Sequence, residues 1–126
     1  MKIADSSYII EGILRDATLL ENETLVSPDL VLYEVANTLW KHETLIGDLR
    51  DSQQRIELLL DLVSNERVQL VRPDRKLLNE TYALSLKHSL PIYDSIFVAL
   101  ALQLKIELAT FDSKQSSVLR QEKQIR

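Results

Sequence analysis

The chain reads PIYDSIFVALAL from residue 91 to residue 102, and this stretch decides the architecture that the rest of the sequence predicts. Pro91 is a typical first residue of a helix, which we expect to reach about Leu104. A helix that is apolar around its whole circumference is covered on all sides, so we expect it at the centre of the protein. Its only acid, Asp94, falls in the first turn, where the helix dipole favours negative charge.

Short apolar runs alternate with longer helical patterns along the rest of the chain. The predicted strands are 2–4, 24–26, 68–71 and 106–110, and the predicted helices are a stretch after residue 5, then about 28–41, 48–63, 73–87 and 113–121. Residues 123–126 are too few and too polar to predict a further strand. This order of elements predicts an α/β fold with a parallel sheet that helices cover on both faces.

Two local patterns make detailed predictions within these helices. Ser27 should be the N-cap of the 28–41 helix, with Pro28 at its first helical position. In the 48–63 helix, one apolar stripe should form from Leu49, Ile56, Leu59, Leu60 and Val63.

Length and composition limit the chain to one small domain. With 126 residues, 45% of them hydrophobic, it has enough apolar side chains for one core and is too short for two domains of usual size, so we expect a single domain over 1–126. Cysteine is absent, which excludes disulfides, thiolate metal sites and a cysteine nucleophile. The first five residues contain neither a secretory signal nor a membrane span, so we expect a cytoplasmic protein.

The net charge of −4 disfavours a protein that binds nucleic acid through a broad basic surface. A nucleic-acid substrate is still compatible with this charge, because bound metal cations can supply the positive charge that phosphates need.

Four acids interrupt otherwise apolar segments. Asp5 and Asp112 each follow a predicted strand and precede a helix, and ligands of open parallel sheets bind beyond the carboxyl ends of the strands. They would meet if the first and fourth strands are neighbours. Glu34 lies two turns into a helix that is apolar on nearly every face, so its carboxylate needs a metal ion or hydrogen-bond partners. We expect Asn37, one turn further on, to place its amide beside Glu34.

Oxygen ligands without cysteine predict a hard cation, Mg²⁺ or Mn²⁺, in place of zinc. Such an ion can generate a hydroxide nucleophile and stabilise the leaving oxygen during phosphodiester cleavage. Structural roles are also open for three of the acids, because Asp5 and Asp112 can cap the helices that follow them and Asp94 can interact with a helix dipole. Ser7 and Thr110 lie beside strand ends, where we expect their hydroxyls to support the acids rather than to bind metal.

Four pieces of the sequence occur in the order found in the PIN domain family and resemble, within it, the VapC-type toxins of prokaryotic toxin–antitoxin pairs. The pieces are IADSS at 3–7, SPDL at 27–30 with Glu34 and Asn37, YDSIFVALA at 93–101 and LATFD at 108–112. The resemblance implies a three-layer α/β/α sandwich with a central parallel sheet of four to five strands. It also implies that Asp5, Glu34, Asp94 and Asp112 form a catalytic, metal-binding set. Around this set we expect Ser7, Asn37 and Thr110.

By the same resemblance, the activity is Mg²⁺- or Mn²⁺-dependent endonucleolytic cleavage of RNA, and the protein is a homodimer that a VapB-type antitoxin neutralises. One alternative is a PIN nuclease that works in RNA processing without an antitoxin. Another is a catalytically silent PIN-like binding module whose acids receive a basic segment of a partner. Phosphatases of the haloacid dehalogenase type and receiver domains fit less well, because Asp5-Ser6-Ser7 lacks a second acid and no acid ends the third predicted strand.

Overall fold

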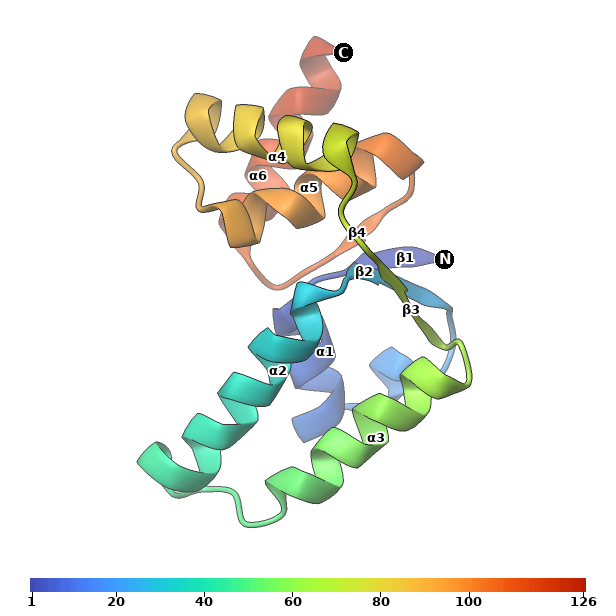
Figure 1. Cartoon of the computed structure of the whole chain (residues 1–126), viewed down its shortest axis with the longest axis vertical. Coiled ribbons are helices and arrows are strands. Elements are labelled where there is room, and N and C mark those ends of the chain that lie inside the picture. The colour runs from blue at the N-terminus through green and yellow to red at the C-terminus, as the bar shows by residue number, and fades with distance from the viewer.

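The computed structural model describes residues 1–126 and contains one four-stranded sheet between two groups of helices (Figure 1). All strand pairs are parallel, and the strand order is β3-β2-β1-β4. The strands are β1 (Lys2–Ala4), β2 (Leu25–Pro28), β3 (Val68–Val71) and β4 (Leu108–Ala109). The predicted α/β/α sandwich with a parallel sheet is therefore confirmed, with four strands.

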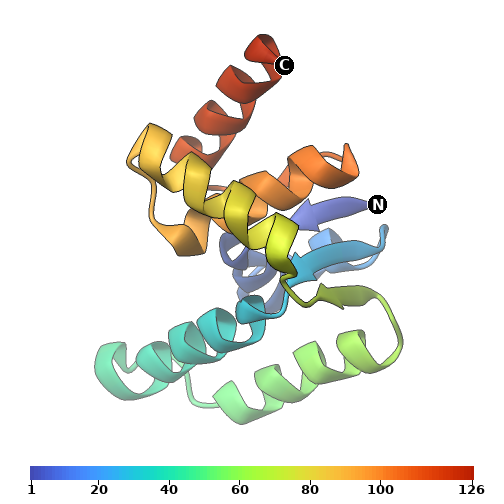
Figure 2. The same ribbon diagram turned by 45° about the horizontal axis from the view of Figure 1, so that its top comes forward.

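Two groups of helices lie on opposite sides of the sheet (Figure 1, Figure 2). The first group is α1 (Ser6–Leu14), α2 (Leu30–Lys41) and α3 (Ser52–Ser64), and the second is α4 (Arg75–His88), α5 (Ile92–Leu104) and α6 (Ser113–Ile125). A short 3₁₀ helix, η1 (Ala17–Leu20), follows α1, and a π-helical turn, η2 (His42–Ile46), extends α2. None of the helices is long and apolar enough to cross a lipid bilayer.

Helix α5 lies at the centre of the core, as its sequence predicts. Every residue from Ser95 to Ala101 is buried. The helix contacts β1, β2 and β4 on the sheet side, while α4 and α6 pack on its other sides. Burial on all sides explains why this helix lacks a polar face.

The predicted N-cap at Ser27, with Pro28 in the helix, is wrong. Both residues continue β2, where Pro28 lies opposite Val71 of β3. Ser27 is fully buried, and its hydroxyl donates to the carbonyl oxygen of Ala4 in β1. Helix α2 begins only at Leu30. Pairing with β3 and the hydroxyl bond to β1 override the local helix-start signal, because together they satisfy buried backbone and hydroxyl groups.

Helix α3 begins four residues later than predicted, at Ser52. The backbone N–H groups of Gly47 and Asp48 both donate to the carbonyl oxygen of His42, at 2.9 and 3.1 Å, so the chain first closes the π-helical turn. Gly47 adopts a left-handed φ of 81°, a conformation that glycine accepts readily.

The predicted apolar stripe is correct at three of its five positions. Leu59 is buried, and Ile56 and Val63 pack against the core, but Leu60 is 41% exposed. Leu49 also packs against the core, but it precedes α3 and is not part of the helix. Consecutive helix residues point about 100° apart, so Leu59 and Leu60 do not face the core together.

The C-terminal elements also differ in length from the prediction. Strand β4 covers only Leu108 and Ala109, because Lys105 ends α5 in a left-handed conformation and the chain first bonds to β1 at residue 107. Helix α6 continues to Ile125 rather than stopping near residue 121.

A polar cluster holds α6 against α4. Glu122 of α6 is buried, and its Oε2 atom accepts hydrogen bonds from Lys87 Nζ and His88 Nε2, both at 2.8 Å. Its Oε1 atom accepts from Arg126 Nη2 at 3.1 Å. These contacts lower the pKa of Glu122 from its usual 4.5 to about 2, and the hydrogen bonds from Lys87 and His88 have the largest effect.

This cluster predicts an acid-dependent part of the stability. Because the pKa of Glu122 is lower in the folded than in the unfolded chain, the contribution is complete above pH 4.5 and is lost as the pH falls toward 2. Lys87 is half exposed and screened by solvent, so we expect Glu122→Gln to be less stable at neutral pH by only about 1–2 kcal/mol. Urea unfolding of both proteins should show this difference shrinking toward zero at low pH, whereas a difference that is constant with pH would contradict it.

Candidate active site

The strand order reverses between the neighbouring strands β1 and β4. The candidate site lies beyond the carboxyl ends of these two strands. The chain places β2 and β3 on one side of β1 and β4 on the other, with Ala4 of β1 opposite Ala109 of β4. The first and fourth strands are therefore neighbours, which is the condition under which Asp5 and Asp112 come together. Asp5 follows β1, and Thr110 and Asp112 follow β4. Ligand sites of open α/β sheets lie in the crevice beyond such a reversal.

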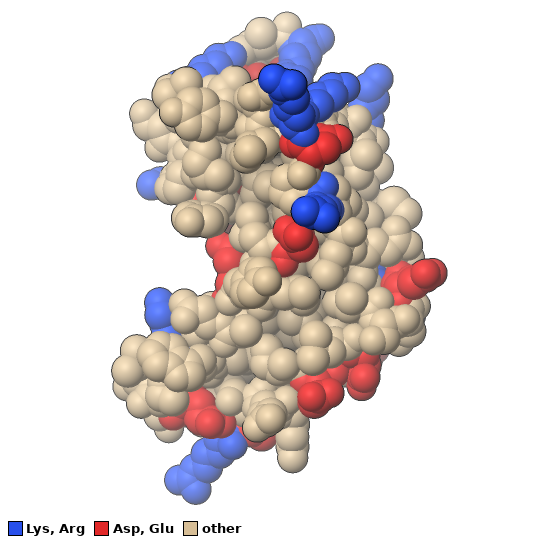
Figure 3. All heavy atoms as spheres, in the orientation of Figure 1, with Lys and Arg blue, Asp and Glu red and all other residues tan.

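A pocket of about 130 Å³ lies at this point, and all four predicted acids line it. In the space-filling view, acidic side chains lie in a notch between the two helix groups (Figure 3). The lining residues are Asp5, Ser6, Ser7, Glu34, Asp94, Phe97, Asp112 and Gln115. The ends of β1 and β4, together with helices α1, α2, α5 and α6, supply these side chains.

Asp5 is 2% exposed and is held by three hydrogen bonds. Its Oδ1 atom accepts from the backbone N–H of Tyr8 at 3.0 Å and from Ser7 Oγ at 2.7 Å, and its Oδ2 atom accepts from Thr110 Oγ1 at 2.6 Å. The Thr110 hydroxyl in turn accepts from the backbone N–H of Asp112 at 2.9 Å. Asp5 therefore caps α1 and faces the pocket at once, and Ser7 and Thr110 fix its orientation.

The hydrogen-bond partner of Glu34 lies on α1, whereas the predicted partner, Asn37, lies on α2. Ser6 Oγ of α1 donates to Glu34 Oε1 at 2.5 Å. The predicted contact with Asn37 is wrong: Asn37 is exposed, makes no hydrogen bond to Glu34 and does not line the pocket. Helix α1 packs against α2 on the side of Glu34, which brings Ser6 within reach while Asn37 faces solvent. Sequence reasoning missed Ser6, which is 28 residues away along the chain.

The pKa of Glu34 is raised above its usual value. Burial is the main cause, and the negative charges of Asp94 and Asp5 act in the same direction, while the hydrogen bond from Ser6 opposes them. A cation bound nearby would stabilise the ionised form of this carboxylate and so lower its pKa.

Asp94, in the first turn of α5, and Asp112, the N-cap of α6, contact the same side-chain amide. Burial, followed by the charge of Asp112, raises the pKa of Asp94. The amide Nε2 of Gln115 donates to Asp94 Oδ1 at 3.5 Å and to Asp112 Oδ2 at 3.4 Å. Asp112 also caps α6 through its Oδ1 atom, which accepts from the backbone N–H of Lys114 at 2.9 Å. Its structural and pocket-facing roles therefore coexist, as they do for Asp5.

The donor chemistry and the charge of the pocket fit a hard divalent cation. All candidate ligands are carboxylate oxygens, which suit Mg²⁺ and Mn²⁺, and two of the four carboxylates have raised pKa values. As the side chains stand, no group of three or more Asp, Glu or His residues is arranged to hold one ion. Hydroxyl groups hold the carboxylates of Asp5 and Glu34, and each carboxylate keeps lone pairs that these bonds do not occupy. The two histidines lie elsewhere, in contacts with Asp48 and Glu122.

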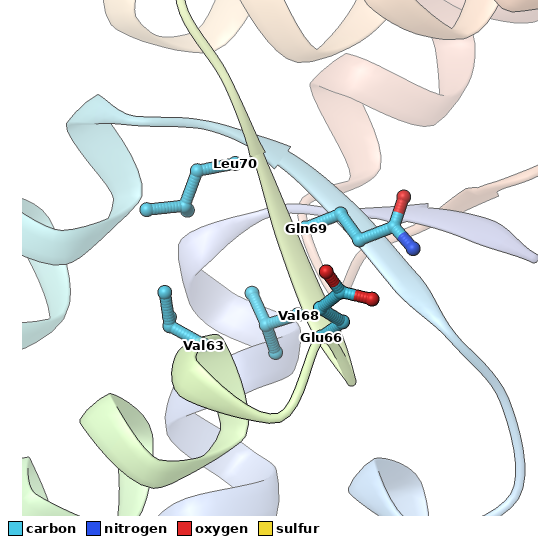
Figure 4. Close-up of a pocket in the computed structure, with 5 residues that line it drawn as sticks. All are labelled: Val63, Glu66, Val68, Gln69 and Leu70. Carbon is cyan, nitrogen blue, oxygen red and sulfur yellow. The ribbon is translucent and has the colours of Figure 1, made fainter.

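A larger hollow, of about 390 Å³, lies beside the edge strand β3 (Figure 4). Its lining residues are Val63, Glu66, Val68, Gln69 and Leu70. It contains one carboxylate and no hydroxyl or imidazole group, so it lacks a set of converging chemical groups. The smaller acidic pocket is the better candidate for catalysis because chemistry, rather than volume, distinguishes an active site.

Comparison with known proteins relates the chain to a family, to a curated relative and to a solved structure. The family model of the PIN domain matches residues 3–120, which include all four pocket acids. Ribonuclease VapC3 of Pyrobaculum aerophilum is 38% identical over 84 residues, which are 67% of this chain and 63% of the relative, so the chain spans less than two thirds of that relative's length. The crystal structure of PAE2754 from Pyrobaculum aerophilum has a TM-score of 0.75, covers 93% of this chain and 83% of that one, and is 17% identical, a likeness in fold alone.

Proposed function

The chain belongs to the PIN domain family, and from this premise we propose that it is a divalent-metal-dependent endoribonuclease, the VapC-type toxin of a toxin–antitoxin pair acting in the cytoplasm. The observation that carries the proposal is the convergence of four carboxylates, from four separate parts of the chain, in one pocket at the reversal of strand order. Kinship with a ribonuclease of the VapC group supports RNA as the substrate.

In this proposal Asp5, Glu34, Asp94 and Asp112 hold Mg²⁺ or Mn²⁺. When bound, the cation supplies the positive charge that a phosphodiester and its attacking water need. The fold of the chain keeps the four carboxylates directed into one small pocket. Ser7 and Thr110 hold Asp5 in place, and Ser6 holds Glu34.

The proposed partners are a second copy of the chain and a VapB-type antitoxin. Support for the homodimer comes from α4, where Leu78, Tyr82 and Leu86 are exposed at intervals of four residues and so form one apolar row along the helix. Support for the antitoxin comes from the kinship with VapC3 and from the sequence resemblance to VapC-type toxins.

Two alternatives follow from the same family. A PIN nuclease in RNA processing would use the same pocket without an antitoxin, and a neighbouring small gene for a DNA-binding antitoxin would distinguish the toxin from it. A catalytically silent binding module would keep the acids for a basic partner segment. The presence of all four acids in one pocket favours the nuclease.

The direct test is cleavage of a mixed cellular RNA pool by the purified protein in Mg²⁺, in Mn²⁺ and in EDTA. We expect RNA fragments with either metal and intact RNA in EDTA, because four carboxylates alone repel a phosphodiester. Cleavage that persists in EDTA, or intact RNA in the presence of folded protein with bound metal, would contradict the proposal.

A further inference from the structure

Gln115 is the buried neutral side chain of the pocket that connects two of the acids. It lies in the first turn of α6 and is 2% exposed. Its amide Nε2 lies 3.5 Å from Asp94 Oδ1 and 3.4 Å from Asp112 Oδ2, so one amide group contacts carboxylates on two helices. This is the only side-chain hydrogen bond that Asp94 makes.

The other end of the same amide has no partner. Gln115 Oε1 is buried and accepts no hydrogen bond. A buried acceptor without a donor costs stability, so packing of α6 against α5 does not by itself account for glutamine here. Its buried neighbours on α6, Val118 and Leu119, are apolar, and an apolar side chain of similar length would pack at position 115 without an unpaired oxygen.

We propose that Gln115 is a positioning residue of the acidic pocket, whose amide sets the separation of Asp94 and Asp112 and so prepares them to share a divalent cation. This inference rests on the function proposed above. A neutral donor can hold two carboxylates together without competing with the cation as a lysine would and without adding the fifth negative charge of a glutamate. Groups that orient metal ligands in this way influence metal affinity while leaving the ligands themselves unchanged.

The test compares Gln115→Met with the wild type. Methionine keeps the length of the side chain and removes both the donor and the unpaired oxygen. In EDTA we expect an unfolding temperature equal to or above that of the wild type. Calorimetric titration with Mn²⁺ should show affinity weakened about 10-fold. In RNA cleavage, the metal concentration for half-maximal rate should rise by a similar factor, with the rate at saturating metal nearly retained.

Gln121→Met is the matched control. Gln121 lies on the same helix, is exposed and donates only to Ser117 Oγ at 3.3 Å. This variant should bind Mn²⁺ as the wild type does. If Gln115→Met does not fold, Gln115→Leu carries the same expectations.

Two outcomes overturn the inference. The first is wild-type Mn²⁺ affinity in folded Gln115→Met, which would show that the amide does not position the carboxylates; if the unfolding temperature is also lower than that of the wild type, Gln115 has a structural role only. The second is a wild-type protein that binds no Mn²⁺, which would overturn the proposed function itself and is thereby distinguished from the first.

Discussion

Asp94→Asn should reduce RNA cleavage by at least about 100-fold while leaving the fold intact. Asparagine keeps the size of the side chain but removes a negative charge from the pocket. Asp94 makes no capping bond to α5, so no backbone contact is lost. Burial and the charge of Asp112 already raise the pKa of Asp94, and for this reason the variant should be at least as stable as the wild type without metal.

The measurement combines RNA cleavage in Mg²⁺ with the circular dichroism spectrum and unfolding temperature in EDTA. Asp61→Asn is a matched control, because Asp61 is an exposed acid of α3 that makes no side-chain hydrogen bond or ion pair. It should cleave RNA at the wild-type rate. A folded Asp94→Asn protein with undiminished cleavage would remove Asp94 from the site.

Phe97→Ala should lower the free energy of unfolding by about 3–5 kcal/mol, the largest effect on stability that we expect from a single substitution. Phe97 is 1% exposed and is the largest of the fully buried side chains. It belongs to the core around α5 and is also the one apolar residue that lines the acidic pocket. Its removal would leave a cavity between the core and the carboxylates, so the loss of packing and a less ordered site should occur together.

Phe111→Ala is the matched control for this prediction. Phe111 is 63% exposed and stacks on Tyr8 with ring centroids 5.9 Å apart. Its loss should lower the free energy of unfolding by no more than about 1.5 kcal/mol. Urea unfolding of both variants measures the difference, and equal losses would contradict the central position of Phe97.

The parts of the fold that the sequence predicted best are those with strong local patterns. The bounds of β3 and the central position of α5 follow from runs of apolar residues, which are stable only when they are buried. Asp5 and Asp112 cap the helices that follow them, as their positions after strands indicated.

Local signals failed where long-range pairing decides the conformation. Ser27 and Pro28 have the residue types of a helix start, yet both extend β2, because both pair with β3 and the Ser27 hydroxyl bonds to β1. The late start of α3 depends on the π-helical turn and on Gly47, and the spacing of apolar residues does not predict either feature. Competition between local preference and sheet pairing is seen only when the partner strands are known.

The acids that line the pocket were predictable as a group because charged side chains stand out in apolar segments. Their neutral partners were not, since Ser6 reaches Glu34 and Gln115 reaches Asp94 across 28 and 21 residues of sequence. Gln115 did carry one readable signal, the three-residue spacing from Asp112 that places both on one side of α6. Asn37 had the same spacing from Glu34 but faces solvent, so spacing alone does not identify the partner of a buried acid.

The most direct test of the central claim, that the four acids hold the catalytic metal, is an anomalous difference map from a crystal of the wild-type protein grown with Mn²⁺. We predict a peak in the acidic pocket within bonding distance of carboxylate oxygens from at least two of Asp5, Glu34, Asp94 and Asp112. An empty pocket at a Mn²⁺ concentration that supports RNA cleavage, or a peak only elsewhere on the molecule, would contradict the claim.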